Sequence, residues 1–167
     1  GTLDCRGDFS TCTLVRTETG GFDYAGFAEY WRAALAAYAA VGVVPDAIGL
    51  QNNPDFIPSA TTPGEGCRFL PVEGTTTAMV DGAVVTLEYP GLAEAQAAVV
   101  EALAELDAPP PILAPETASA AMVAEFLAPL DLGPVGTITH HLYGMDAAAI
   151  DVRTLSALGE LARSLER

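Results

Sequence analysis

Apolar side chains recur at three- and four-residue steps between positions 22 and 42, and this spacing predicts an amphipathic helix. Asp23 precedes the first turn and is a good N-cap residue, and Phe22 can pack on Phe27 as a hydrophobic staple. Gly42 follows the last apolar position and predicts the end of the helix. The apolar face consists of Phe27, Tyr30, Trp31, Ala34, Leu35, Tyr38 and Val41.

Short apolar runs alternate with longer helical patterns in the rest of the chain. Asp81-Gly82 separates two apolar runs, 77–80 and 83–87, and predicts a β-hairpin. Residues 1–21 and 53–75 are rich in small, polar and turn-forming residues and predict loops. The other expected elements are strands at 46–52, 112–114 and 135–143, and helices at 92–106, 119–127 and 152–165, the last with Asp151 as its N-cap.

This alternation predicts one α/β domain over residues 1–167, with about three parallel strands and an added hairpin. Polar residues follow each expected strand. In parallel α/β folds, ligands bind at the carboxyl ends of the strands, which share one rim. Three polar strand ends on one rim would suit a sugar or another polar metabolite.

Composition narrows the range of partners. Half of the residues are hydrophobic and 17% are charged, which indicates a folded chain. The formal net charge is −15 and the chain has no Lys, so its field repels nucleic-acid phosphates and anionic membrane surfaces. No apolar run approaches the roughly 18 residues of a membrane-spanning helix. Because the chain starts at Gly1 without Met, we expect a removed leader or an internal segment of a longer protein.

The three cysteines leave two interpretations open. All three are unconnected thiols, or one disulfide joins Cys5 to Cys12 or ties this loop to Cys67, which requires an oxidising compartment. Positions 6–8 read Arg-Gly-Asp and are similar to an integrin-binding tripeptide, although matches of three residues often arise by chance.

The polar residues at the strand ends also have two interpretations each. Residues 51–55 form either a polar turn or an amide cluster that hydrogen-bonds sugar hydroxyl groups. Glu116 either stabilises the start of the next helix or faces the ligand rim. In a strand, His141 and Tyr143 would point to one face and His140 to the other, so we expect no metal site. We also expect no cofactor, because no phosphate-binding Gly loop or nucleophile elbow is present.

Several stretches, in a consistent order between about positions 13 and 144, carry a family resemblance. They are Gly21-Phe-Asp-Tyr-Ala-Gly-Phe-Ala-Glu-Tyr-Trp31, Gly42-Val-Val-Pro-Asp46, Ile48-Gly-Leu-Gln-Asn-Asn-Pro-Asp55, Tyr89-Pro90-Gly91, Ile112-Leu-Ala-Pro-Glu-Thr117 and His141-Leu-Tyr-Gly144. Together they resemble glycoside hydrolase family thirty, which includes glucuronoxylanases and glucosylceramidase-like enzymes with a (β/α)₈ catalytic barrel.

The resemblance implies that the three expected strands are the fourth, fifth and sixth of such a barrel. It also implies a retaining mechanism, in which a Glu after the fourth strand is the acid/base and a Glu after the seventh is the nucleophile. Here Asn53 occupies the acid/base position. Asn52 matches the residue that contacts the sugar hydroxyl next to the reacting carbon. His141 and Tyr143 match the pair that lines the subsite near the nucleophile.

The chain departs from this family pattern at two points. Asn53 cannot give and take back a proton, although retaining hydrolysis needs both steps from one carboxyl group. The chain also ends at Arg167, before a seventh strand, whereas a complete barrel takes about 250 residues. We therefore expect a partial (β/α)₈ barrel of a retaining glycosyl hydrolase that is inactive alone.

Other expectations follow from this assignment. The substrate would be an oligosaccharide or glycoside, contacted by Asn52, Glu116, His141 and Tyr143, and the protein would be extracellular. Because open strand edges seek partners, the remaining barrel segment or a second copy of the chain is expected to bind. Two alternatives stay open, a non-catalytic carbohydrate-binding relative and a secreted adhesion module built on the Cys5–Cys12 loop.

Overall fold

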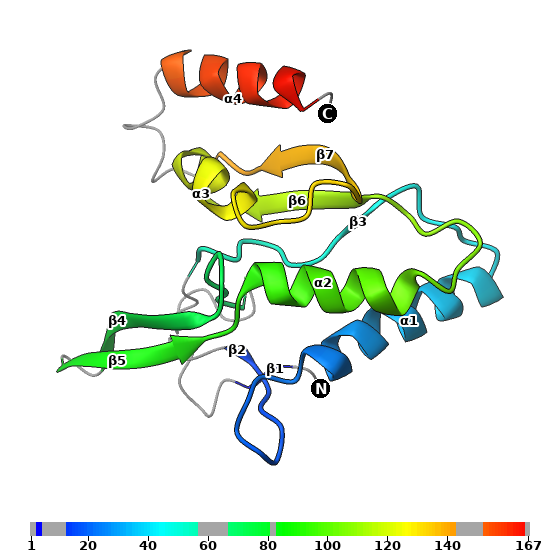
Figure 1. The fold of residues 1–167 in the computed structure, drawn as a ribbon, viewed down its shortest axis with the longest axis horizontal. Helices are drawn as coiled ribbons and strands as arrows, with labels where there is room; N and C mark the ends of the chain where they lie inside the picture. Colours follow the sequence, from blue (N-terminus) through cyan, green and yellow to red (C-terminus); the bar gives the residue numbers. More distant parts are fainter. Residues whose placement is uncertain (1–2, 5–12, 57–66, 81–82, 143–151, 166–167) are drawn as a thin grey trace.

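The computed structural model describes residues 3–4, 13–56, 67–80, 83–142 and 152–165 (Figure 1). Helices and strands alternate in this part of the chain, and the mixed α/β class is confirmed. The strands are β1 (Leu3–Asp4), β2 (Thr13–Leu14), β3 (Ile48–Gly49), β4 (Gly74–Val80), β5 (Ala83–Tyr89), β6 (Ile112–Thr117) and β7 (Val135–His140). The helices are α1 (Tyr24–Ala40), α2 (Leu92–Leu103), the 3₁₀ helix η2 (Ala120–Met122), α3 (Val123–Leu127) and α4 (Val152–Ser164).

A three-stranded parallel sheet with the order β3-β6-β7 lies at the centre of the fold (Figure 1). In its register, Ile48 is opposite Ile112, and Ile112 is opposite Val135. The expectation of three parallel strands is confirmed, and β6 takes the middle position. Closure of this sheet into a barrel remains a prediction.

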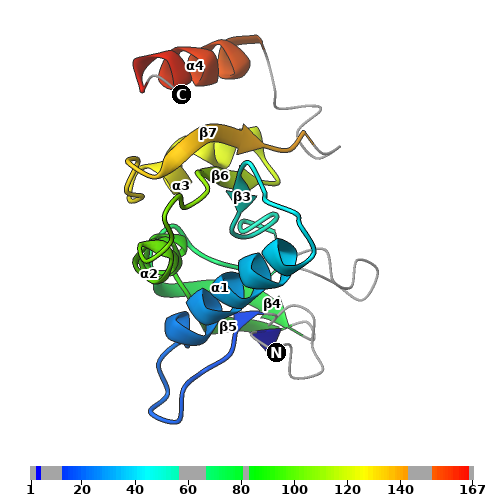
Figure 2. The ribbon, with the colours of Figure 1, turned by 90° about the vertical axis from the view of Figure 1, so that its right-hand side faces the viewer.

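Helices α1 and α2 pack against each other on one side of this sheet (Figure 2). The α2 residues Leu92 and Val99 join Ile112 and Ala114 of β6 in the main core cluster. Burial of each large aliphatic side chain contributes about 1.5–3 kcal/mol to stability. The face of the sheet that contacts these two helices is called the helix-covered face.

The ends of α1 follow the sequence prediction closely. The carboxylate of Asp23 accepts the backbone N–H of Gly26 at 2.8 Å, which satisfies one of the free donors of the first turn. Gly42 follows the C-cap with a φ of 80°, a conformation that glycine adopts without a steric cost. Phe22 and Phe27 are both buried, and the ring centroid of Phe27 lies 5.9 Å from that of Phe69.

The predicted hairpin is present and longer than expected, since β4 and β5 pair over seven residues each. It lies in the connection from β3 to α2 and projects away from the parallel sheet (Figure 1). Near its base, Arg16 forms an ion pair with Glu88 at 3.0 Å, and Leu70 bridges to Gly91. The turn residues 81–82 lie outside the described residues.

Other sequence predictions need correction. The stretch 1–21 is not all loop, because β1 pairs with β2 and Arg16 bridges to Phe22. The expected strand at 46–52 is reduced to Ile48–Gly49, since only these residues have a partner on β6. The third helix starts as the 3₁₀ turn η2, with the Ser119 side chain accepting the N–H of Ala121. The predicted cap Asp151 lies outside the described residues.

Cys67 is a free thiol and completely buried, so the alternative in which a disulfide ties the N-terminal loop to Cys67 is wrong. Cys5, Cys12 and the Arg-Gly-Asp tripeptide lie outside the described residues. Within the described ranges, no helix has the length and apolar character needed to cross a membrane.

Candidate functional site

The carboxyl ends of β3, β6 and β7 meet at one rim, which we call the strand-end rim (residues 51–55, 116–119 and 140–142). The backbone N–H of Asn53 donates to the carbonyl of Glu116 at 3.0 Å. The backbone N–H of His141 donates to the carbonyl of Thr117 at 2.8 Å. These two bonds bring three of the predicted site residues, Asn53, Glu116 and His141, together. Asn52 precedes Asn53 on the same rim, and the fifth predicted site residue, Tyr143, lies outside the described residues.

Asn53 is held in a sharp turn directly after β3. Its φ is 52°, in the left-handed region that Asn tolerates better than most residues. Its carbonyl accepts the N–H of Phe56 at 3.0 Å, and its side chain is only 4% exposed. Asn52, by contrast, is exposed, and its carbonyl accepts a hydrogen bond from the Gln51 side chain at 3.0 Å. Asn52 is therefore the more accessible of the two amides.

Asp55 joins the β3 end of the rim to the β6 end. Its carboxylate accepts the backbone N–H groups of Ala118 at 2.6 Å and Ser119 at 3.1 Å. On the other side, its carbonyl accepts a hydrogen bond from Arg68 at 2.7 Å. Sequence reasoning placed Asp55 in a polar turn but did not find this bracing role, because its partners lie more than 60 residues further along the chain.

Glu116 sits in a β-bulge of β6. In the register, Pro115 is opposite Thr139 and Thr117 is opposite His140, so Glu116 is the extra residue between them. Its φ of 57° is uncommon for a residue other than glycine. A bulge re-aims a side chain relative to the strand alternation, and bulges of this kind are frequent beside functional sites. The peptide bond before Pro115 is cis.

The carboxyl group of Glu116 reaches across the sheet to β3. A Cβ built on Gly49 would overlap this carboxyl group, so the carboxyl occupies the space where a side chain at position 49 would lie. Ile48 and Leu50, the neighbours of Gly49, are buried in the core. Since side chains alternate along a strand, the Glu116 carboxyl lies on the sheet face opposite to that of α1 and α2.

Burial raises the pKa of the Glu116 carboxyl above its ordinary value, because a half-buried carboxylate loses hydration. Among the residues that the structure describes, no hydrogen bond or ion pair to this carboxyl group is present. A carboxyl with this environment at a strand end is a candidate functional group.

The histidines do not follow the predicted strand alternation. β7 ends at His140, one residue before His141, so the strand geometry that would separate the two side chains does not apply to His141. Both histidines are half-buried, and Nδ1 of His140 lies 3.3 Å from the carbonyl oxygen of His141. Among the described residues, no group of three metal-binding side chains comes together.

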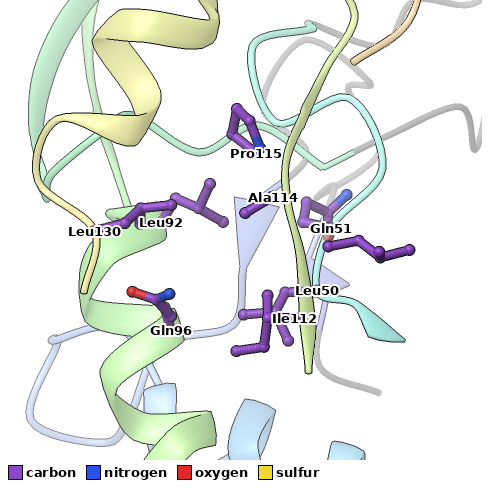
Figure 3. Close-up of a pocket in the computed structure, with 9 residues that line it drawn as sticks. Leu50, Gln51, Leu92, Gln96, Ile112, Ala114, Pro115 and Leu130 are labelled. Atoms are coloured by element: carbon purple, nitrogen blue, oxygen red, sulfur yellow. The ribbon is translucent and has the colours of Figure 1, made fainter. Parts of the chain in front are cut away.

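A small cavity lies between α2 and the sheet, lined mainly by apolar side chains such as Leu92, Ile112 and Ala114 (Figure 3). Its volume of about 10 Å³ has room for about one water molecule. Gln96 lies beside it and is bonded to the backbone of Asp131, donating to the carbonyl at 2.8 Å and accepting from the N–H at 3.0 Å. This cavity belongs to the helix-covered core and is separate from the Glu116 face.

The strand-end rim presents hydrogen-bonding groups, which are the exposed Asn52, the half-buried histidines and the Glu116 carboxyl group. Groups of this kind can form hydrogen bonds with hydroxyl groups. The rim lacks a carboxyl group at position 53, and an amide cannot donate and recover a proton as a carboxylic acid does. No protein-family model, curated protein or solved structure matches this chain.

Proposed function

We propose that this chain carries the middle strands of a glycosidase-type (β/α)₈ barrel and that its strand-end rim binds an oligosaccharide or glycoside without cleaving it. The observation that carries the proposal is the pair of backbone hydrogen bonds that link Asn53 to Glu116 and Thr117 to His141. These two bonds support the side-by-side order of the strand ends that the family resemblance implies for the fourth, fifth and sixth strands of the barrel.

The proposed lack of cleavage follows from the chemistry of position 53. A retaining glycosidase uses two carboxyl groups about 5–5.5 Å apart, one as nucleophile and one as acid and then base. General acid–base help is worth on the order of 10²–10⁴ in rate. With Asn53 at the acid/base position, the rim keeps its capacity for hydrogen bonding but loses this proton transfer.

The proposed partner is a further strand–helix segment of the same barrel type. β3 and β7 each have one strand neighbour among the described residues, so both outer edges can pair. The last turn of α1 and the segment after it also expose large apolar side chains that a partner can cover, with Tyr38 52%, Val41 75% and Val44 81% exposed. A second copy is the less favoured partner, because each copy carries a formal charge of −15.

Isothermal titration calorimetry with xylo- and gluco-oligosaccharides tests the binding proposal. We expect binding to one series and its loss in Asn52→Ala and His141→Ala, with Glu101→Gln on the exposed side of α2 as the control. Absence of heat across both series would argue against the proposal.

A hydrolysis assay on the same oligosaccharides tests the proposed lack of cleavage. We expect no turnover by the chain alone or by Asn53→Glu alone. Turnover is expected only when Asn53→Glu is combined with a segment that supplies the missing strands and the nucleophile. Turnover by the unmodified chain would contradict the role given to Asn53.

A further inference from the structure

The bulge at Glu116 places a carboxyl group where the sequence alone would place none. Strand alternation would direct residue 116 to the same face as Ile112 and Ala114, which belong to the core. The extra residue and the left-handed φ turn its side chain to the opposite face, over Gly49. Glycine at position 49 is what leaves room for the carboxyl group there.

Among the residues that the structure describes, no cation pairs with the Glu116 carboxyl group. Asp55 is occupied by two backbone N–H groups, and the Arg68 guanidinium donates to the Asp55 carbonyl and lies 5.5 Å from the ring centroid of Tyr89. His140 and His141 complete the ionisable groups on the described part of the rim. Elsewhere, Arg16 and Arg32 pair with acidic residues on their own surfaces.

A half-buried carboxylate that has no partner within the described ranges gains most from a donor that carries a positive charge, because charge-assisted hydrogen bonds are about twice as strong as neutral ones. The negative field of the chain adds long-range attraction for a cation and repulsion for an anion. A metal ion is a poor fit, since the described residues do not bring three suitable ligands together.

We infer that the strand-end rim prefers amino sugars, such as glucosamine oligomers, over neutral sugars and sugar acids, and that the Glu116 carboxylate held over Gly49 binds the sugar ammonium group. This inference rests on the proposed function and names its ligand class. The rim amides and His141 would bind the ring hydroxyl groups, and Glu116 would supply the selectivity.

The burial that raises the pKa of Glu116 supports this assignment. A nearby ammonium group favours the ionised carboxylate and opposes the effect of burial. The ammonium group therefore offsets the cost of the hydration that the buried carboxylate has lost. A neutral hydroxyl group offsets this cost only in part.

Calorimetry at about pH 6, where sugar amines are protonated, tests the inference with five ligands. They are glucosamine trimer, N-acetylglucosamine trimer, glucose trimer, a glucuronate-bearing xylo-oligosaccharide and trilysine, which carries charge but no sugar ring. We expect glucosamine trimer to bind about tenfold or more tightly than its acetylated form. Trilysine binding as tightly as glucosamine trimer would overturn the inference, since attraction to net charge would then explain it.

Two variants localise the effect. Glu116→Gln removes the charge, and Gly49→Ala displaces the carboxyl group, which can move because it is the flexible end of a side chain. Both variants are expected to bind glucosamine trimer no more tightly than its acetylated form, and Glu101→Gln is expected to keep the preference for the amine. A preference that survives in Glu116→Gln would overturn the inference.

The outcomes separate this inference from the proposed function. Equal affinity for the amine and its acetylated form would refute the amino-sugar preference and leave sugar binding intact. Failure of every sugar to bind would refute the proposed function itself.

Discussion

The carboxylate of Asp55 accepts the backbone N–H of Ala118 at 2.6 Å and thereby ties the turn after β3 to the end of β6. The same carboxylate accepts the N–H of Ser119 at 3.1 Å. The Asp55 side chain therefore adds to the backbone bond between Asn53 and Glu116 in fixing the relative position of these two strand ends.

Replacement of Asp55 by Ala is expected to destabilise the fold. It removes two hydrogen bonds to a charged group and leaves the Ala118 and Ser119 N–H groups without their acceptor, at a cost of about 2–4 kcal/mol. Urea denaturation measures this loss, and Asp107→Ala, at an exposed position, is the control. A loss of less than about 0.5 kcal/mol, as at ordinary surface positions, would show that the rim is held by other contacts.

Gln96→Glu is expected to weaken the fold most at neutral pH. Gln96 is 2% exposed and donates to the Asp131 carbonyl while accepting the Asp131 N–H. An ionised Glu keeps the acceptor, loses the donor and buries a charge, for a loss of about 2–3 kcal/mol or more. A protonated Glu can donate again, so the loss should shrink in acid. Unfolding measured at several pH values checks this, and a loss independent of pH would contradict it.

The Glu116 carboxyl is expected to make stability fall as pH rises. Its pKa is raised in the folded state, so below the ordinary carboxyl pKa of about 4.3 both states are protonated and burial carries no charge penalty. As pH rises through the folded-state pKa, the native state must hold a half-buried carboxylate and loses stability. Glu116→Gln should therefore gain stability relative to the unmodified chain between acid and neutral pH. Measurement of the free energy of unfolding of both proteins at several pH values checks this. A Glu116→Gln variant that loses stability relative to the unmodified chain as pH rises would contradict it.

Cys67 is expected to resist thiol reagents in the folded protein. Its side chain is completely buried, and burial raises its pKa to about 12, so almost no thiolate exists at neutral pH. Mass spectrometry after brief alkylation should find the Cys67 peptide unmodified without denaturant and modified in concentrated urea. Rapid native modification would show that the segment starting at Cys67 opens easily.

Much of the architecture could be predicted because it depends on local patterns. The Asp23 cap and the Gly42 end of α1 involve neighbours within a turn or two, and both are present in the structure. The predicted apolar face of α1 is only partly correct, because Phe27 and Leu35 are buried, whereas Tyr30, Tyr38 and Val41 are exposed. The parallel order of the strands followed from the helices between them. The pairing of β1 with β2 escaped prediction because each strand has only two residues and carries no periodicity.

The site was less predictable because its geometry depends on contacts between distant segments. The sequence indicated that Asn53, Glu116 and His141 follow strands, and the structure places them on one rim. It did not indicate the bulge at Glu116, the space over Gly49 or the bracing by Asp55. These features arise when β3 and β6 pair, and no local pattern in either strand encodes them.

Backbone NMR during titration with an oligosaccharide tests the central claim most directly. The account predicts that the amide resonances of residues 51–55, 116–119 and 140–142 shift together and saturate at one ligand concentration. Resonances at the opposite ends of the strands, such as Ile112 and Val135, should stay in place. Shifts confined to those opposite ends, or no shifts at the strand-end rim at a saturating concentration, would contradict the account.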